Sequence, residues 1–307
     1  MRIWFSVMSG ALAMSVVLDA AQVPTFRSSV ASVRVDVLVT EDRRVVRGLR
    51  ASDFEVTDNG VRQVVENALH ATVPIDVTLI IDASGSTESI FDDIRRNGQR
   101  ILELLRPQDR ARVLVIETSA YELVPLLTVG ERFVLPKERQ PGHLSGIHDA
   151  VLAGLVSRPD ADRRRLVVVL TDGVDTRSIT SAQTLDDVAR RSDAVLHIVQ
   201  VRPSAVQVVP RSTSTRSGKR PAFIPFGEKS TGGRFHGSSA DSLLGAKPGV
   251  NVIETVRAVF EEFRQSYVIQ YQPRDVPAGG WHDVVIRVKG VDPSGVRARA
   301  GYFGAAQ

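Results

Sequence analysis

Residues 80–86 read Ile-Ile-Asp-Ala-Ser-Gly-Ser, an apolar run that ends in the pattern Asp-x-Ser-x-Ser. A second apolar run, residues 166–173, reads Leu-Val-Val-Val-Leu-Thr-Asp-Gly and also ends in an aspartate. Continuous apolar runs are typical of strands that are covered on both faces of a parallel sheet. Ligands of open α/β sheets bind beyond the carboxyl ends of the strands. Asp82 and Asp172 are therefore predicted to lie at the edge of the sheet where a ligand binds.

The side chains at these strand ends are all oxygen donors. Ser84 and Ser86 offer neutral hydroxyls, and Asp82 and Asp172 offer carboxylates. Because the segments contain no His or Cys, the set favours a hard cation such as Mg²⁺, with Mn²⁺ as the alternative. The competing interpretation is that Ser84 and Ser86 cap the helix that follows.

Together the two motifs resemble the metal-ion-dependent adhesion site (MIDAS) of the von Willebrand factor A (VWA) domain, the module found in integrin I domains. The resemblance implies an α/β fold with a doubly wound, mainly parallel, Rossmann-like sheet. It also implies a further ligand, a threonine that precedes a helix in another loop. Residues 141–150, Pro-Gly-His-Leu-Ser-Gly-Ile-His-Asp-Ala, fit that loop and place Ser145 at the threonine position. His143 and Leu144 stand where bacterial relatives have glycines.

The metal ligands implied by this match are Asp82, Ser84, Ser86, Ser145 and Asp172. Mg²⁺ retains exchangeable water, so a carboxylate from a partner protein is expected to complete its coordination. A Ser–His–Asp hydrolase built from Ser84, His148 and Asp172 is the enzymatic alternative. That alternative is disfavoured because residues 82–86 lack a Gly-x-Ser-x-Gly elbow.

The flanking segments have a different pattern. Val33, Val35, Val37 and Val39 alternate with polar residues, and residues 58–60 read Asp-Asn-Gly, a hairpin turn signal. The tail, residues 266–304, is again β-type. We expect residues 30–72 and 266–304 to pair into a small antiparallel β domain around a VWA domain at 73–265.

The resemblance extends to the bacterial exported "VWFA-related" family. It is carried by residues 35–60, by 263–273 (Phe-Arg-Gln-Ser-Tyr-Val-Ile-Gln-Tyr-Gln-Pro) and by 298–302 (Ala-Arg-Ala-Gly-Tyr). The resemblance implies an exported protein, periplasmic or extracellular. Residues 1–21, a short basic start and an apolar run with small residues near Ala21, are interpreted as a secretory signal peptide. No transmembrane segment is expected in the mature chain.

The amino-acid composition disfavours several further classes of function. The 307 residues carry a formal net charge of +4 and a pI near 9.7, but Lys and Arg form no continuous basic face with aromatics, so nucleic acid is not an expected partner. The chain has no cysteine, which removes disulfides and thiol chemistry. The sequence therefore predicts a non-enzymatic, Mg²⁺-dependent protein-binding module. A structural or assembly component of a cell-envelope complex, indifferent to metal, is the alternative, and the oligomeric state is left open.

Overall fold

The computed structural model describes residues 32–304 with gaps at 43, 71–72, 85–86, 88–90, 92–99, 102, 118, 129–144, 158–159, 161, 174, 201–227 and 237–251. The predicted signal peptide lies outside the described residues, as do Ser86, His143 and Leu144.

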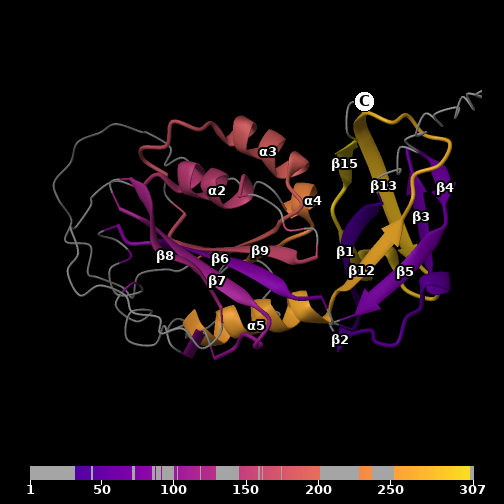
Figure 1. Cartoon of the computed structure of the whole chain (residues 1–307), viewed down its shortest axis with the longest axis horizontal. Coiled ribbons are helices and arrows are strands. Elements are labelled where there is room, and N and C mark those ends of the chain that lie inside the picture. The colour runs from indigo at the N-terminus through magenta and orange to yellow at the C-terminus, as the bar shows by residue number, and fades with distance from the viewer. Residues whose placement is uncertain are drawn as a thin grey trace, which may run out of the picture. The chain divides into compact units, whose positions relative to one another are not determined.

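The described part contains a six-stranded sheet with the order β11-β10-β9-β6-β7-β8 (Figure 1). Strands β6, β7, β9, β10 and β11 are parallel, and edge strand β8 runs antiparallel to β7. The bounds are β6 Ile75–Asp82, β7 Arg110–Ile116, β8 Ala120–Thr128, β9 Arg164–Thr171, β10 Val195–Gln200 and β11 Phe235–His236. The prediction of an α/β fold is confirmed, and the two aspartate motifs end adjacent strands, β6 and β9.

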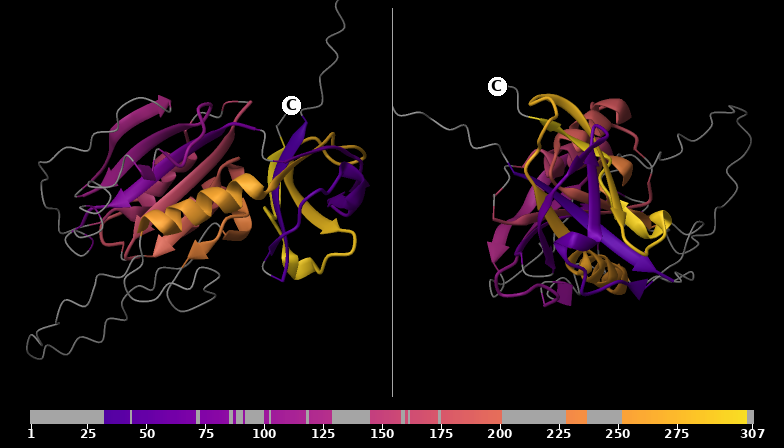
Figure 2. Two further views of the ribbon diagram at one scale, coloured as in Figure 1. Left: turned by 90° about the horizontal axis from the view of Figure 1, so that it is seen from below. Right: turned by 90° about the vertical axis from the view of Figure 1, so that its right-hand side faces the viewer.

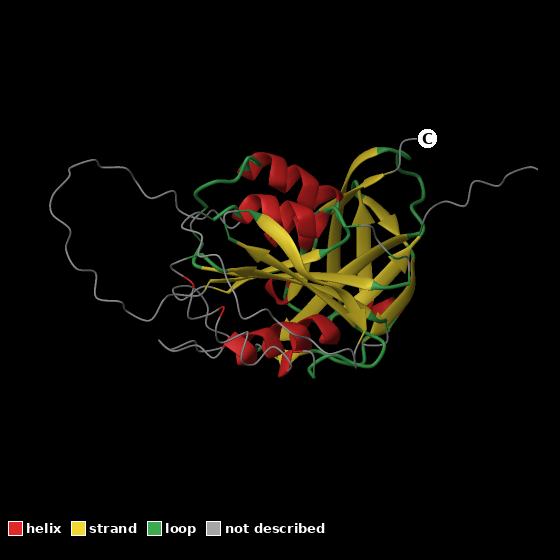
Figure 3. Cartoon of the chain, turned by 60° about the vertical axis from the view of Figure 1, so that its left-hand side comes forward, coloured by secondary structure: helices red, strands yellow, loops and turns green. Residues whose placement is uncertain are grey.

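Helices cover both faces of this sheet. Helices α2 (Ile147–Leu155) and α3 (Ala182–Arg191) lie over one face, and α5 (Val252–Gln265) lies over the other (Figures 1 and 3). Strand β6 shows why its sequence is almost wholly apolar. Leu79 and Ile81 pack with the α5 side of the core, whereas Ile80 packs with the α2 and α3 side. A short helix, α4 (Glu228–Thr231), precedes β11.

The turn between α4 and β11 requires glycine. Gly232 has a φ of +76°, and a Cβ on Gly233 would lie 1.7 Å from the Leu196 carbonyl oxygen. The Thr-Gly-Gly segment at 231–233 therefore lets β11 approach β10 as the last strand of the sheet.

The flanking segments form two antiparallel sheets (Figure 2). One has the order β14-β1-β12-β5, with β2 also paired to β1, and the other has the order β15-β13-β3-β4. The first comprises β1 Val33–Glu41, β2 Arg44–Val45, β5 Val65–His70, β12 Tyr267–Tyr271 and β14 Val296–Ala298. The second comprises β3 Phe54–Asp58, β4 Val61–Gln63, β13 Gly280–Val288 and β15 Gly301–Gly304. N-terminal and C-terminal strands pair directly, for example Val35 opposite Ile269.

Two β segments are each divided between the sheets. Segment 61–70 breaks at Val64, which is 69% exposed, so β4 and β5 join different sheets. Segment 296–304 breaks in the same way between β14 and β15. A shared core packs between the sheets and includes Val37, Val56 and Ile269, so each break lets one segment contribute to both layers.

Buried polar contacts join the β sheets to the α/β body. Arg164 at the start of β9 is 5% exposed, and its guanidinium donates to Asp36 Oδ1 of β1 at 2.6 Å. It also donates to the Phe263 carbonyl at 2.9 Å and to Ser266 Oγ at 2.5 Å, where α5 ends and β12 begins. These bonds fix the end of α5 to both parts of the fold.

Candidate functional site

Asp82 is the buried centre of the candidate site, with no exposed surface. It ends β6, where the Ala83 backbone N–H donates to the Ile116 carbonyl of β7 at 2.8 Å. One carboxylate oxygen, Oδ1, accepts the Ser84 backbone N–H at 3.1 Å, and the other, Oδ2, accepts the Thr171 hydroxyl at 2.7 Å. Asp82 therefore links the end of β6 to the end of β9.

Ser84 and Thr87 form a tight turn after β6. The Thr87 hydroxyl donates to the Asp82 carbonyl at 2.6 Å and to the Ser84 carbonyl at 3.0 Å. The Ser84 hydroxyl lies 3.3 Å from Thr87 Oγ1. Both side chains are buried. The turn thus keeps the Ser84 hydroxyl next to Asp82 in the folded chain.

The end of β9 brings a second carboxylate to this edge. Thr171 accepts the Gly173 backbone N–H at 3.0 Å, which folds the chain back directly after Asp172. Gly173 has a φ of +87°, a conformation that a side chain would strain. Half-buried Asp172 is held at its carbonyl by Gln200 Nε2 of β10 at 3.1 Å.

The two carboxylates influence each other. Burial is the main cause that raises the pKa of Asp82 above its usual range. Hydrogen bonds from Thr171 and Ser84 lower this pKa, and the negative charge of Asp172 adds to the rise. Two carboxylates that repel at the edge of a sheet are the arrangement that a divalent cation stabilises.

Ser145 presents a buried hydroxyl just before α2. It is 3% exposed, and its Oγ has no hydrogen-bond partner among the described residues. A buried hydroxyl without a partner is costly and calls for an explanation. Ser145 precedes α2, which packs against β6 and β9 in the same core cluster. The loop that follows β9 holds its backbone, since the Ser145 N–H donates to Thr176 Oγ1 at 2.8 Å.

The loop at 175–180 is anchored by two carboxylates. Asp175 accepts the His148 N–H at 2.9 Å, the Ser178 N–H at 3.0 Å and the Arg177 N–H at 3.2 Å. Burial acts to raise the pKa of Asp175, but the bonds from Ser178 and His148 outweigh it and hold the pKa below its usual range. Asp149 accepts the N–H groups of residues 179 and 180 at 3.0 and 2.9 Å. Asp175 therefore fixes the backbone turn of this loop.

His148 belongs to the same loop contacts. Its Nδ1 lies 3.0 Å from the Thr180 carbonyl and 3.8 Å from Asp175 Oδ2. The hydrolase alternative required His148 to act on Ser84, whereas these contacts assign its ring to positioning the 175–180 loop.

The structure places Asp82, Ser84 and Asp172 at one edge of the sheet, and Ser145 at the start of the helix that packs there. Thr87 and Thr171 were missing from the predicted set. Thr171 had a usable signal, since it stands directly before the strand-ending aspartate. Thr87 had a weaker one, as a hydroxyl residue at the start of the segment after the Asp-x-Ser-x-Ser motif. Both act through Asp82 and Ser84.

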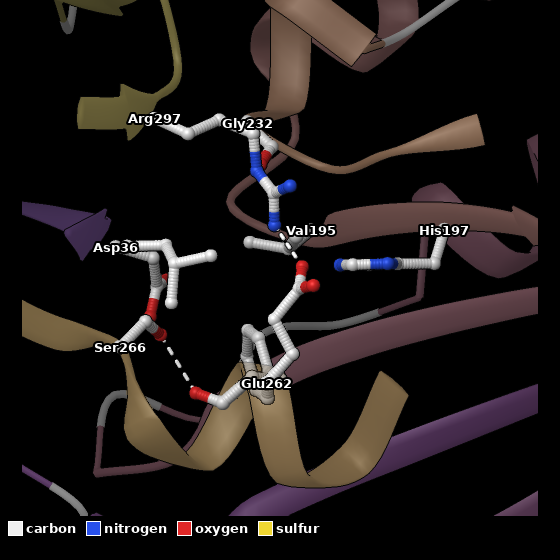
Figure 4. A pocket seen from close by; sticks show the side chains of 9 residues that line it. Asp36, Val195, His197, Gly232, Glu262, Ser266 and Arg297 are labelled. Atoms are coloured by element: carbon white, nitrogen blue, oxygen red, sulfur yellow. Dashed lines mark hydrogen bonds and ion pairs between the residues drawn. The ribbon is translucent and has the colours of Figure 1, made fainter. Parts of the chain in front are cut away.

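The described part of the chain holds no group of three His, Cys, Asp or Glu residues arranged to bind a metal ion. A cavity of about 10 Å³ lies between β1, β10 and α5, away from the candidate site (Figure 4). Glu262 and Arg297 form an ion pair in it, and His197 points toward Glu262. It has room for about one water molecule.

Within the described residues, no helix is both long enough and apolar enough to cross a bilayer. No protein-family model and no curated protein sequence matches the chain.

Solved structures do match. An aerotolerance-related membrane protein from Bacteroides fragilis is 15% identical, with a TM-score of 0.41, and the match covers 62% of this chain and 98% of that one. BatB from Bacteroides thetaiotaomicron is 15% identical, with a TM-score of 0.40 and the same coverage. The ArnB paralog VWA2 from Sulfolobus acidocaldarius is 12% identical, with a TM-score of 0.36, over 55% of this chain and 44% of that one. The strand order, and the two aspartate motifs at the ends of adjacent strands, give this chain the α/β fold that the sequence predicted.

Proposed function

We propose that this chain is an exported protein-binding module whose VWA-like body captures a carboxylate of its partner through a bound Mg²⁺ ion. Asp82, Ser84, Ser86, Ser145 and Asp172 would hold the ion. When bound, the ion supplies a positive charge and an exchangeable coordination position for the partner's carboxylate.

The observation that carries the proposal is the Ser145 hydroxyl, which stands before the helix packed on β6 and β9. It is buried, and none of the residues that the structure describes forms a hydrogen bond with it. A ligand for that oxygen removes its desolvation penalty. The remaining donors suit a hard ion, because they are hydroxyls and two carboxylates.

The negative charges of Asp82 and Asp172 also support a bound divalent cation. Burial raises the pKa of the Asp82 carboxylate, and the negative charge of Asp172 adds to the rise. A divalent cation would attract both carboxylates and offset their repulsion. Hydroxyls as direct ligands leave much of the cation's charge for the partner. The site therefore suits capture of an acidic group.

Calorimetric titration of Mg²⁺ into the purified chain tests the ion. We expect uptake of Mg²⁺ by wild type, its loss in Asp82→Ala, and wild-type uptake in Asp187→Ala, which removes an exposed carboxylate from α3. Mn²⁺ should substitute for Mg²⁺. Wild type that takes up neither ion would refute the proposal.

Affinity capture tests the partner. Cell-envelope proteins are applied to the immobilised chain in Mg²⁺ and eluted with EDTA, with Asp82→Ala and Asp187→Ala columns in parallel. We expect EDTA-eluted partners from the wild-type and Asp187→Ala columns. Partners that bind equally to all three columns and resist EDTA would favour a structural component of an envelope complex instead.

A further inference from the structure

The loop at 175–180 exposes an isoleucine to solvent. Ile179 is 96% exposed, the largest exposed fraction among the exposed large apolar side chains of the described residues. The next is Val64 at 69%. Single exposed apolar residues are common on protein surfaces, so exposure by itself assigns nothing. The backbone beneath Ile179 distinguishes it.

Five consecutive backbone N–H groups of this loop, those of residues 176–180, are hydrogen bonded. The Ser145 carbonyl accepts the first two at 2.9 and 3.2 Å. Asp175 accepts from residues 177 and 178, and Asp149 accepts from residues 179 and 180. Two carboxylates are thereby committed to holding the chain that displays Ile179. A surface fixed before binding loses less conformational entropy when a partner arrives.

The anchors also fix where the loop lies. Ser145 is both the candidate metal ligand and the residue whose backbone exchanges hydrogen bonds with Thr176. The loop begins two residues after Gly173, at the end of β9. Arg177, exposed in the same loop, adds a positive charge that attracts an acidic partner.

We propose that residues 175–180 form a recognition loop beside the candidate metal site, in which Ile179 packs against an apolar side chain next to the partner's carboxylate. The partner is a protein segment that carries Asp or Glu beside a residue such as Leu, Ile or Phe. The inference rests on the proposed function, because the metal is what captures the carboxylate. Ile179 then determines which acidic segments bind.

A library of random 12-residue peptides displayed on phage tests this directly. The library is selected on the immobilised full chain in Mg²⁺, and the enriched peptides are synthesised and titrated. We expect them to contain Asp or Glu beside a large apolar residue. Ile179→Ser should bind them about tenfold more weakly, the effect of losing most of one buried apolar contact.

Val156→Ser is the matched control. Val156 is 60% exposed and follows α2 at the end opposite Ser145, so it lies about 13 Å along the helix from the anchored end. It should bind the peptides within about twofold of wild type. Thermal unfolding of both variants checks that the fold is unchanged.

The outcomes separate the two proposals. If EDTA and Asp82→Ala abolish binding while Ile179→Ser and Val156→Ser bind alike, the recognition loop is wrong and the metal-dependent function stands. If Ile179→Ser weakens binding that EDTA and Asp82→Ala leave intact, the metal-dependent function is wrong and the loop remains a recognition surface for apolar segments. Enriched peptides without an apolar neighbour to the acid, or no enrichment at all, overturn the recognition loop.

Discussion

Replacing Ser145 with alanine separates a metal ligand from an ordinary buried serine. A buried hydroxyl without a partner costs about 1–3 kcal/mol. The Ser145 hydroxyl has no hydrogen-bond partner among the described residues, and Ser145→Ala removes it while leaving the backbone contacts with Thr176 in place. In EDTA, we therefore expect the variant to be more stable than wild type by about 1–2 kcal/mol. Most serine-to-alanine changes at hydrogen-bonded core positions have the opposite sign.

Mg²⁺ should reverse the order of stability of wild type and Ser145→Ala. A ligand at about 100 times its Kd stabilises the folded state by about 2.7 kcal/mol. Wild type should gain this amount, and Ser145→Ala should lose most of it because one ligand is missing. In Mg²⁺, wild type then becomes more stable than the variant by about 1 kcal/mol. Urea unfolding in EDTA and in excess Mg²⁺ measures all four free energies.

Ser192→Ala is the control for this cycle. Ser192 is 7% exposed, but its hydroxyl donates to the Leu155 carbonyl at 3.0 Å and accepts the Ala194 N–H at 3.2 Å. Its loss should cost about 1 kcal/mol in both buffers. The reasoning fails if Ser145→Ala behaves like Ser192→Ala in EDTA, or gains as much from Mg²⁺ as wild type.

Three further substitutions test the electrostatics of the fold. Burial raises the pKa of Asp82, so without metal the ionisation of this carboxyl opposes folding. The stability of wild type relative to Asp82→Asn should therefore fall as pH rises from 3.8 through the raised folded-state pKa. Urea unfolding in EDTA measures this difference. Burial acts to raise the pKa of Asp76, but hydrogen bonds from Arg110 and Arg163 lower it overall. Asp76→Asn should lower the free energy of unfolding by about 3 kcal/mol at pH 7. This difference should disappear as pH falls from 3.8 through the lowered folded-state pKa. Asp58 has no exposed surface and accepts hydrogen bonds from both Tyr271 and Tyr302. Asp58→Ala should therefore lower the free energy of unfolding by about 3–5 kcal/mol. A loss below about 1 kcal/mol in guanidinium unfolding would contradict this account.

The sequence alone determined the α/β fold and the edge at which polar side chains gather. Residues 166–170 are all apolar, and residues 77–81 are apolar except for Thr78, because both faces of their strands are covered. The aspartates that follow had to lie at the carboxyl ends of the strands. The pairing of adjacent strands β6 and β9 then brought them to the same edge.

Tertiary structure decided what periodicity does not encode. The breaks at Val64 and between β14 and β15 depend on a second sheet that packs against the first. A local sequence pattern does not predict such packing between sheets. The bonds of Asp149 with residues 179 and 180, and of Asp175 with the His148 N–H, join segments about 30 residues apart. Burial of the Ser145 hydroxyl, with no hydrogen-bond partner among the described residues, likewise results from packing. Burial and hydrogen bonding between distant segments are properties of the packed chain. The sequence could therefore predict Ser145 as a ligand, but only the tertiary structure decides that its hydroxyl is buried.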